Sequence, residues 1–113
     1  MISPINYVAH VDFLTDEDGV VSRVMAKDYS NGANVYERKY LNGEFKGLGE
    51  RIVTLSNNNP LRKLGMQDIG KIVYSHNNVD YFINDKNHRE IFSGNLKELR
   101  KFIKTIKKLI PKL

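Results

Sequence analysis

The chain has 113 residues, of which 41% are hydrophobic and 27% are charged, and its formal net charge is +5. This length suits one domain over residues 1–113 with a single core. The absence of cysteine excludes a disulfide framework and a cysteine-based zinc site. Because the apolar runs fall far short of the roughly 20 residues of a membrane-spanning helix, and no signal peptide is recognisable, we expect a cytoplasmic protein.

Turn signals divide most of the chain into β-prone segments. Asn-Gly pairs at 31–32 and 42–43 are strong hairpin signals, because type I′ turns need positive φ at both central residues. Weaker signals occur at 15–19 and 76–80. The predicted strands lie at about residues 5–14, 20–29, 34–41, 44–55, 70–75, 79–84 and 88–92. We therefore predict about seven short antiparallel strands.

Two helices are also predicted, one between the two groups of strands and one at the C-terminal end. Asn59, Pro60 and Gly65 are typical of a short helix with an N-cap and a C-terminal stop. Asn95 and Glu98 have the spacing of a capping box, and apolar residues follow at helical intervals. The predicted fold class is α+β, with the strands packed against one C-terminal amphipathic helix as a curved sheet or a small barrel.

The C-terminal helix concentrates the positive charge. From Asn95 to Leu113 there are seven basic residues and one acid, a charge of +6, which leaves −1 for the rest of the chain. Its candidate binding residues are Lys97, Arg100, Lys101, Lys104, Lys107 and Lys108. This basic face suits a solvated surface, a phosphate-binding surface or a docking site for an acidic protein. A role on a membrane surface would require the apolar side of this helix to face lipid, but the same side is expected to cover the sheet.

A second candidate surface lies on the predicted hairpin over residues 20–41. A two-residue turn at Asn31–Gly32 would place Lys27 opposite Tyr36 and Arg23 opposite Tyr40. One face would then combine cations and tyrosines: Arg23, Lys27, Tyr36, Arg38 and Tyr40. This combination can bind RNA or single-stranded DNA by charge and stacking, and it equally suits a protein interface.

The opposite face of the same hairpin offers the only candidate catalytic set. The spacing of Asp28, Glu37 and Lys39 resembles the metal site of restriction-endonuclease-like nucleases. The resemblance covers these three residues alone, and it implies a Mg²⁺ held by the two carboxylates with a lysine that assists water attack. That family has a helix before its first strand, and none is predicted here.

No other motif indicates catalysis or a cofactor. The three histidines are scattered, and the glycines at 43–49 lack the spacing of a phosphate-binding loop. We therefore expect a non-enzymatic binding or regulatory protein without metal or cofactor, similar in role to inhibitors, immunity proteins and phage-encoded accessory proteins. Its expected partner is another protein, and an acidic surface on that partner would suit the basic helix. The alternatives are nucleic-acid binding and a Mg²⁺-dependent nuclease, and the oligomeric state is open.

Overall fold

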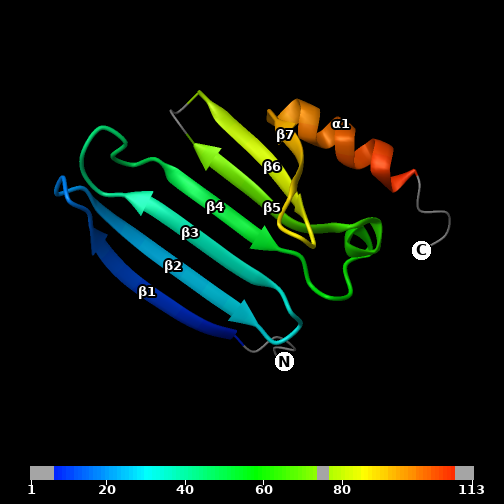
Figure 1. The fold of residues 1–113 in the computed structure, drawn as a ribbon, viewed down its shortest axis with the longest axis horizontal. Helices are drawn as coiled ribbons and strands as arrows, with labels where there is room; N and C mark the ends of the chain where they lie inside the picture. The colour runs from blue at the N-terminus through cyan, green and yellow to red at the C-terminus, as the bar shows by residue number, and fades with distance from the viewer. Residues whose placement is uncertain (1–6, 74–76, 109–113) are drawn as a thin grey trace, which may run out of the picture.

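The computed structural model describes residues 7–73 and 77–108, which form one antiparallel sheet and one α-helix (Figure 1). The elements are β1 (Tyr7–Thr15), β2 (Val21–Tyr29), β3 (Asn34–Tyr40), β4 (Gly49–Thr54), the 3-10 helix η1 (Pro60–Leu64), β5 (Met66–Val73), β6 (Val79–Asp85), β7 (Glu90–Gly94) and α1 (Leu96–Lys107). The sheet order follows the chain order from β1 to β7. The predicted α+β class is confirmed. The alternative of a barrel is wrong, because β1 and β7 lie at opposite edges of an open sheet.

Three of the hairpins use the same tight turn. In each, a backbone N–H donates to the carbonyl four residues later, from Asp16, Tyr29 and Asp85, at 3.0, 2.9 and 2.8 Å. The last loop residue has positive φ: Gly19 at 79°, Gly32 at 86° and His88 at 61°. This geometry is the three-residue loop that combines a type I turn with a bulge.

The three-residue loop changes the register predicted between β2 and β3. Tyr29 pairs with Ala33, so Arg23 lies opposite Lys39 instead of Tyr40. The predicted pairing is therefore wrong by one residue. Since alternate side chains point to opposite faces, a shift of one residue moves every β3 side chain to the other face relative to β2.

The long strand predicted at about 44–55 is shorter in the structure. Residues 41–48 form a loop in which Gly43 and Gly47 have φ values of 79° and 83°. The side chain of Asn42 accepts the Val21 N–H at 2.7 Å and donates to the Gly19 carbonyl at 3.1 Å. These two hydrogen bonds hold the loop against the turn between β1 and β2.

Both helix starts agree with the sequence prediction. The Asn59 side chain accepts the Leu61 N–H at 3.0 Å, and Gly65 ends η1 with φ 92°. The Asn95 side chain accepts the Glu98 N–H at 2.9 Å, and Glu98 accepts the Asn95 N–H at 3.0 Å. The predicted capping box is confirmed.

The core lies between α1, η1 and the β5–β7 half of the sheet. Met66 and Ile83 are almost completely buried, with 2% and 0% exposure. The rings of Phe92 and Phe102 stack at 5.0 Å between β7 and α1. The buried apolar cluster consists of Leu55, Leu61, Met66, Ile83 and Leu99. We call the sheet face with Ile83 and Phe92 the helix face and the opposite face, with Phe82, the back face.

The β1–β4 half of the sheet extends away from this core (Figure 1). Helix α1 contacts β6 and β7, and η1 contacts β5. No described element covers β1–β4 on either face. The radius of gyration is 16.1 Å, compared with about 13 Å for a compact domain of this length. The accessible surface is 8203 Å², whereas a compact monomer of this mass exposes about 6,300 Å².

Candidate binding surface

The structure divides the predicted cation and tyrosine surface between the two faces of the sheet. Arg23 and Lys27 lie on the helix face, as their pairing with Lys39 and Val35 requires. The other three predicted residues, Tyr36, Arg38 and Tyr40, lie on the back face, since they pair with Ala26, Val24 and Ser22. The tyrosines therefore do not alternate with Arg23 and Lys27 on one surface.

The three candidate nuclease residues are divided in the same way. Glu37 and Lys39 are on the helix face, and Asp28 is on the back face. The side chain of Asn34, directly opposite Asp28, donates a hydrogen bond to the Asp28 carboxylate. Residues 7–73 and 77–108 contain no group of three His, Cys, Asp or Glu residues that could hold a metal ion.

The helix face of β2–β5 is strongly basic. By strand alternation its cations are Arg23, Lys27, Lys39, Arg51 and Lys71. Glu37 is the one acid on this face within β2–β5, so these side chains carry a net charge of +4. Asp85 at the end of β6 lies on the same face, which gives +3 over all the described strands. Two like-charged pairs face each other directly across strands, Arg23 with Lys39 and Arg51 with Lys71. Such pairs destabilise an isolated sheet.

The back face has the opposite charge. Its acids, counted over the described strands, are Asp12, Asp28, Glu50, Asp68, Asp80 and Glu90. Arg38 is the one Lys or Arg among these strand positions, so the net charge is −5. The Nε atom of Arg38 is buried and has no hydrogen-bond partner among the described residues. The sheet is therefore basic on one side and acidic on the other.

The predicted cations of α1 are on the protein surface. All six, from Lys97 to Lys108, are exposed, and none forms an ion pair with another described residue. Arg100, Lys104, Lys107 and Lys108 line an open hollow of about 550 Å³ together with Ile103. This basic flank of α1 adds positive charge beside the helix face of the sheet.

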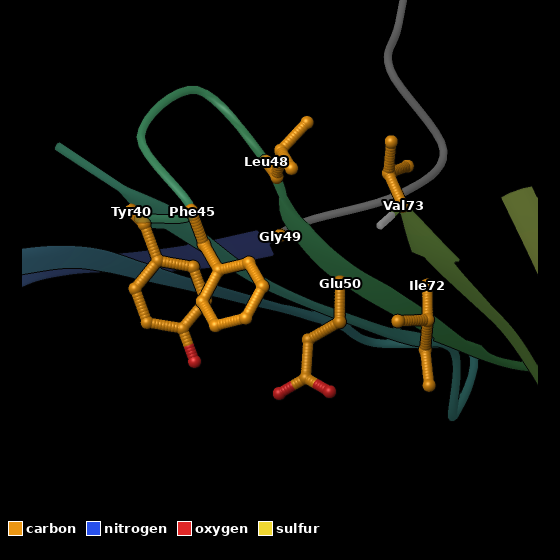
Figure 2. Close-up of a pocket in the computed structure, with 7 residues that line it drawn as sticks. All are labelled: Tyr40, Phe45, Leu48, Gly49, Glu50, Ile72 and Val73. Carbon is orange, nitrogen blue, oxygen red and sulfur yellow. The ribbon is translucent and has the colours of Figure 1, made fainter. Parts of the chain in front are cut away.

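A shallow apolar pocket lies near the loop between β3 and β4. Its volume is about 150 Å³, and its lining consists of Tyr40, Phe45, Leu48, Gly49, Glu50, Ile72 and Val73. Figure 2 shows the rings of Tyr40 and Phe45 side by side, with Glu50 and Ile72 pointing to the same side. The ring centroids are 6.0 Å apart. Two aromatic rings beside one carboxylate suit an apolar group that carries a positive charge.

One buried acid has a structural explanation. Asp68 is 7% exposed, and its carboxylate accepts a hydrogen bond from the Thr54 hydroxyl at 2.9 Å. His88 Nδ1 lies 3.7 Å from the other carboxylate oxygen. This contact links the turn between β6 and β7 to the centre of the sheet.

Sequence reasoning missed Arg51 and Lys71. Each lies in a strand with ordinary alternation, and neither belongs to a recognisable motif. The signal that unites them is their direct pairing across β4 and β5. Only the register between those strands could have shown that both belong to the face with Arg23 and Lys39.

Comparison of the chain with protein-family models, with curated proteins and with solved structures finds no match. Among the described residues, no helix has both the length and the apolar character needed to cross a membrane. The function is therefore inferred from the charged surfaces of the sheet.

Proposed function

We propose that the protein is a non-enzymatic binding protein that recognises an acidic surface of another protein through the helix face of β2–β5. The observation that carries this proposal is a set of two directly opposed like-charged pairs, Arg23 with Lys39 and Arg51 with Lys71. They lie on a sheet face that α1 contacts at β6 and β7 and η1 contacts at β5. Directly opposed cations cost stability in the free protein, typically a few tenths to about 1 kcal/mol for a cross-strand pair. Carboxylates of a partner would relieve this repulsion.

A recognition role also accounts for the shape of the molecule. A sheet whose β1–β4 half extends beyond the core offers more surface than a compact fold of the same mass. Charge complementarity between such a face and its partner accelerates association and selects the partner. The cysteine-free composition suits action in the cytoplasm, as for inhibitors, immunity proteins and phage-encoded accessory proteins.

Nucleic-acid binding is the second candidate. Its specific support is that α1 adds an exposed row of cations to those of the sheet, since phosphate contacts need only positive charge. Binding of single strands by stacking has less support, because Tyr36 and Tyr40 lie on the acidic back face. We therefore rank an acidic protein above nucleic acid.

The test compares two charge-matched double variants. Arg51→Gln with Lys71→Gln neutralises a like-charged pair on the helix face, whereas Lys46→Gln with Lys86→Gln removes the same charge from exposed loop positions. Binding of a labelled glutamate-rich peptide and of a labelled DNA duplex is measured by fluorescence anisotropy at about 50 and about 200 mM salt, a range that strongly weakens phosphate contacts.

We expect the peptide to bind, and we expect the helix-face variant to lose more affinity than its control. Unfolding in urea should show the helix-face variant to be close to the parent in stability, because Arg51→Gln removes both the repulsion from Lys71 and the attraction to Glu37 across the neighbouring strands. Tighter binding of DNA than of the peptide, at both salt concentrations, would replace the leading proposal with the second candidate. Equal losses in the two variants, or no binding of either probe, would contradict recognition by this face.

A further inference from the structure

Strand β1 is a long, unprotected edge of the sheet. It has nine residues, Tyr7–Thr15, with no proline or lysine, and its register with β2 runs without a bulge. Proteins usually protect such edges with charged residues, prolines, bulges or short strands, because a free edge can pair with another chain. The strand at the other edge, β7, is shorter and contacts α1.

The backbone hydrogen bonds show which groups of β1 are free. The Asp16 N–H donates to the Val20 carbonyl at 3.0 Å, so the backbone of Asp16 points toward the β2 side. Successive residues of an antiparallel strand direct their backbone N–H and carbonyl groups alternately toward one neighbouring strand and toward the other side. Val8, His10, Asp12 and Leu14 therefore direct their backbone groups toward β2. The alternate residues, Ala9, Val11 and Phe13 among them, direct their N–H and carbonyl groups away from the sheet.

The side chains of β1 are also unusually exposed and apolar. Val8, Val11, Phe13 and Leu14 are 57%, 47%, 65% and 46% exposed. They make up half of the exposed large hydrophobic residues in the described part of the chain. Both the backbone and the side chains of this strand are thus available to a partner.

We propose that β1 pairs with β1 of a second copy of the chain, antiparallel and centred on Val11. The two Val11 residues then lie opposite each other, and Ala9 lies opposite Phe13 of the second copy. On the back face, His10 lies opposite Asp12 and Val8 opposite Leu14, each pair occurring twice. An imidazole faces a carboxylate, and apolar side chains face apolar side chains.

The adjacent registers lack this complementarity. Centring the pair on His10 or on Asp12 places two histidines or two carboxylates opposite each other. Centring it on Ala9 pairs only residues 7–11 of the described strand with one another, whereas centring it on Phe13 places Asp12 opposite Leu14. Since like charges opposed across strands are unfavourable, the sequence of β1 selects the Val11 register.

The surface of the molecule has room for this interface. Its 8203 Å² exceed the surface of a compact monomer by about 1,900 Å², and a stable interface buries about 800 Å² per partner. The twofold axis would stand perpendicular to the sheet, so the helix faces of both copies would lie on the same side. The dimer would present one continuous sheet with a doubled basic surface.

Single-cysteine variants test the register, because the native chain has no cysteine. In the dimer the Cα atoms of the two Val11 residues would be about 5.5 Å apart, within the range of a disulfide of about 4.4–6.8 Å. The two Phe13 residues would be about 14 Å apart along the strands. On mild oxidation we expect Val11→Cys to form a covalent dimer and Phe13→Cys to remain uncrosslinked, although Phe13 is the more exposed residue.

A mixture of Ala9→Cys and Phe13→Cys proteins should form a crosslinked heterodimer. In sedimentation the parent should be a dimer, and Val11→Lys should be a folded monomer, because it opposes two lysines at the axis. Ile91→Lys is the matched control on β7, where Ile91 is 43% exposed, and it should remain dimeric. A monomeric parent, or crosslinking of Val11→Cys no faster than that of Phe13→Cys, would overturn the proposal.

Discussion

The contact between Gly70 and Phe82 yields the sharpest stability prediction. These residues face each other across β5 and β6 on the back face. A Cβ atom at position 70 would lie 1.9 Å from Cζ of Phe82 and 2.2 Å from its Cε1 atom. The ring therefore lies directly over the glycine, and Gly70→Ala must displace it.

The free-energy change has two opposing parts. Displacing a half-buried phenylalanine loses about 1.5–2 kcal/mol of apolar burial. Alanine in a strand interior regains about 0.5–1 kcal/mol relative to glycine. Gly70→Ala should therefore destabilise the parent by about 1 kcal/mol. In a Phe82→Ala background no ring opposes the new methyl group, and the same substitution should stabilise the protein by about 0.5–1 kcal/mol.

The assay is urea unfolding of the parent, both single variants and the double variant. The coupling free energy from this cycle should be about 2 kcal/mol, well above the deviation of about 0.3–0.5 kcal/mol expected for independent sites. A Gly70→Ala effect of the same sign in both backgrounds, with coupling below about 0.5 kcal/mol, would refute the proposed contact.

Three further predictions concern the core, the helix cap and a turn. Ile83→Ala should lower the free energy of unfolding in urea by about 2–5 kcal/mol, because Ile83 has 0% exposure; a loss below about 1 kcal/mol would show that this position repacks. Asn95→Ala should cost about 1 kcal/mol by removing the N-cap of α1, with a matching loss of Tm, and an unchanged Tm would show that the hydrogen bond to Glu98 contributes nothing. The pKa of Asp85 lies below its usual 3.8, chiefly because the Arg89 backbone N–H donates a hydrogen bond to its carboxylate. The charged carboxylate therefore stabilises the fold at pH values above the unfolded-state pKa, and this stabilisation is lost as the pH falls through the folded-state pKa. Asp85→Asn should thus lower Tm at pH 7 and converge with the parent at acid pH, whereas a constant difference across this range would contradict the role of the charge.

Local sequence signals were sufficient for the element order. The capping box at Asn95 and Glu98 needs only side chains within one turn of helix, and the stop at Gly65 needs only a residue that tolerates positive φ. Seven strands were recognised because turn residues separate them. Their approximate positions follow from contacts between near neighbours in the chain.

The predicted surface of cations and tyrosines depended on the register between β2 and β3. Sequence patterns specify only weakly the loop length that sets this register. Asn31 and Gly32 fit both a two-residue and a three-residue loop. The structure uses the longer one, in which the Asn31 side chain accepts the Ala33 N–H at 3.0 Å. The extra loop residue shifts the register between β2 and β3 by one residue. Tyr36 and Lys27 therefore lie on opposite faces of the sheet, and so do Asp28 and Glu37.

The basic helix face could not be predicted from the sequence for a related reason. Arg51 and Lys71 are distant in sequence and become neighbours only through the pairing of β4 with β5. The formal charge of +5 also averages a basic and an acidic side of the same sheet. A net charge therefore gave no indication of the separation of charge across the two faces.

Affinity capture from an extract of the source organism tests the central claim most directly. Three immobilised baits are compared: the parent, Arg51→Gln with Lys71→Gln, and the charge-matched control Lys46→Gln with Lys86→Gln. The account predicts that an acidic protein, identified by mass spectrometry, is retained by the parent and the control and is lost from the helix-face variant. Retention of the same proteins by all three baits would contradict recognition through the helix face.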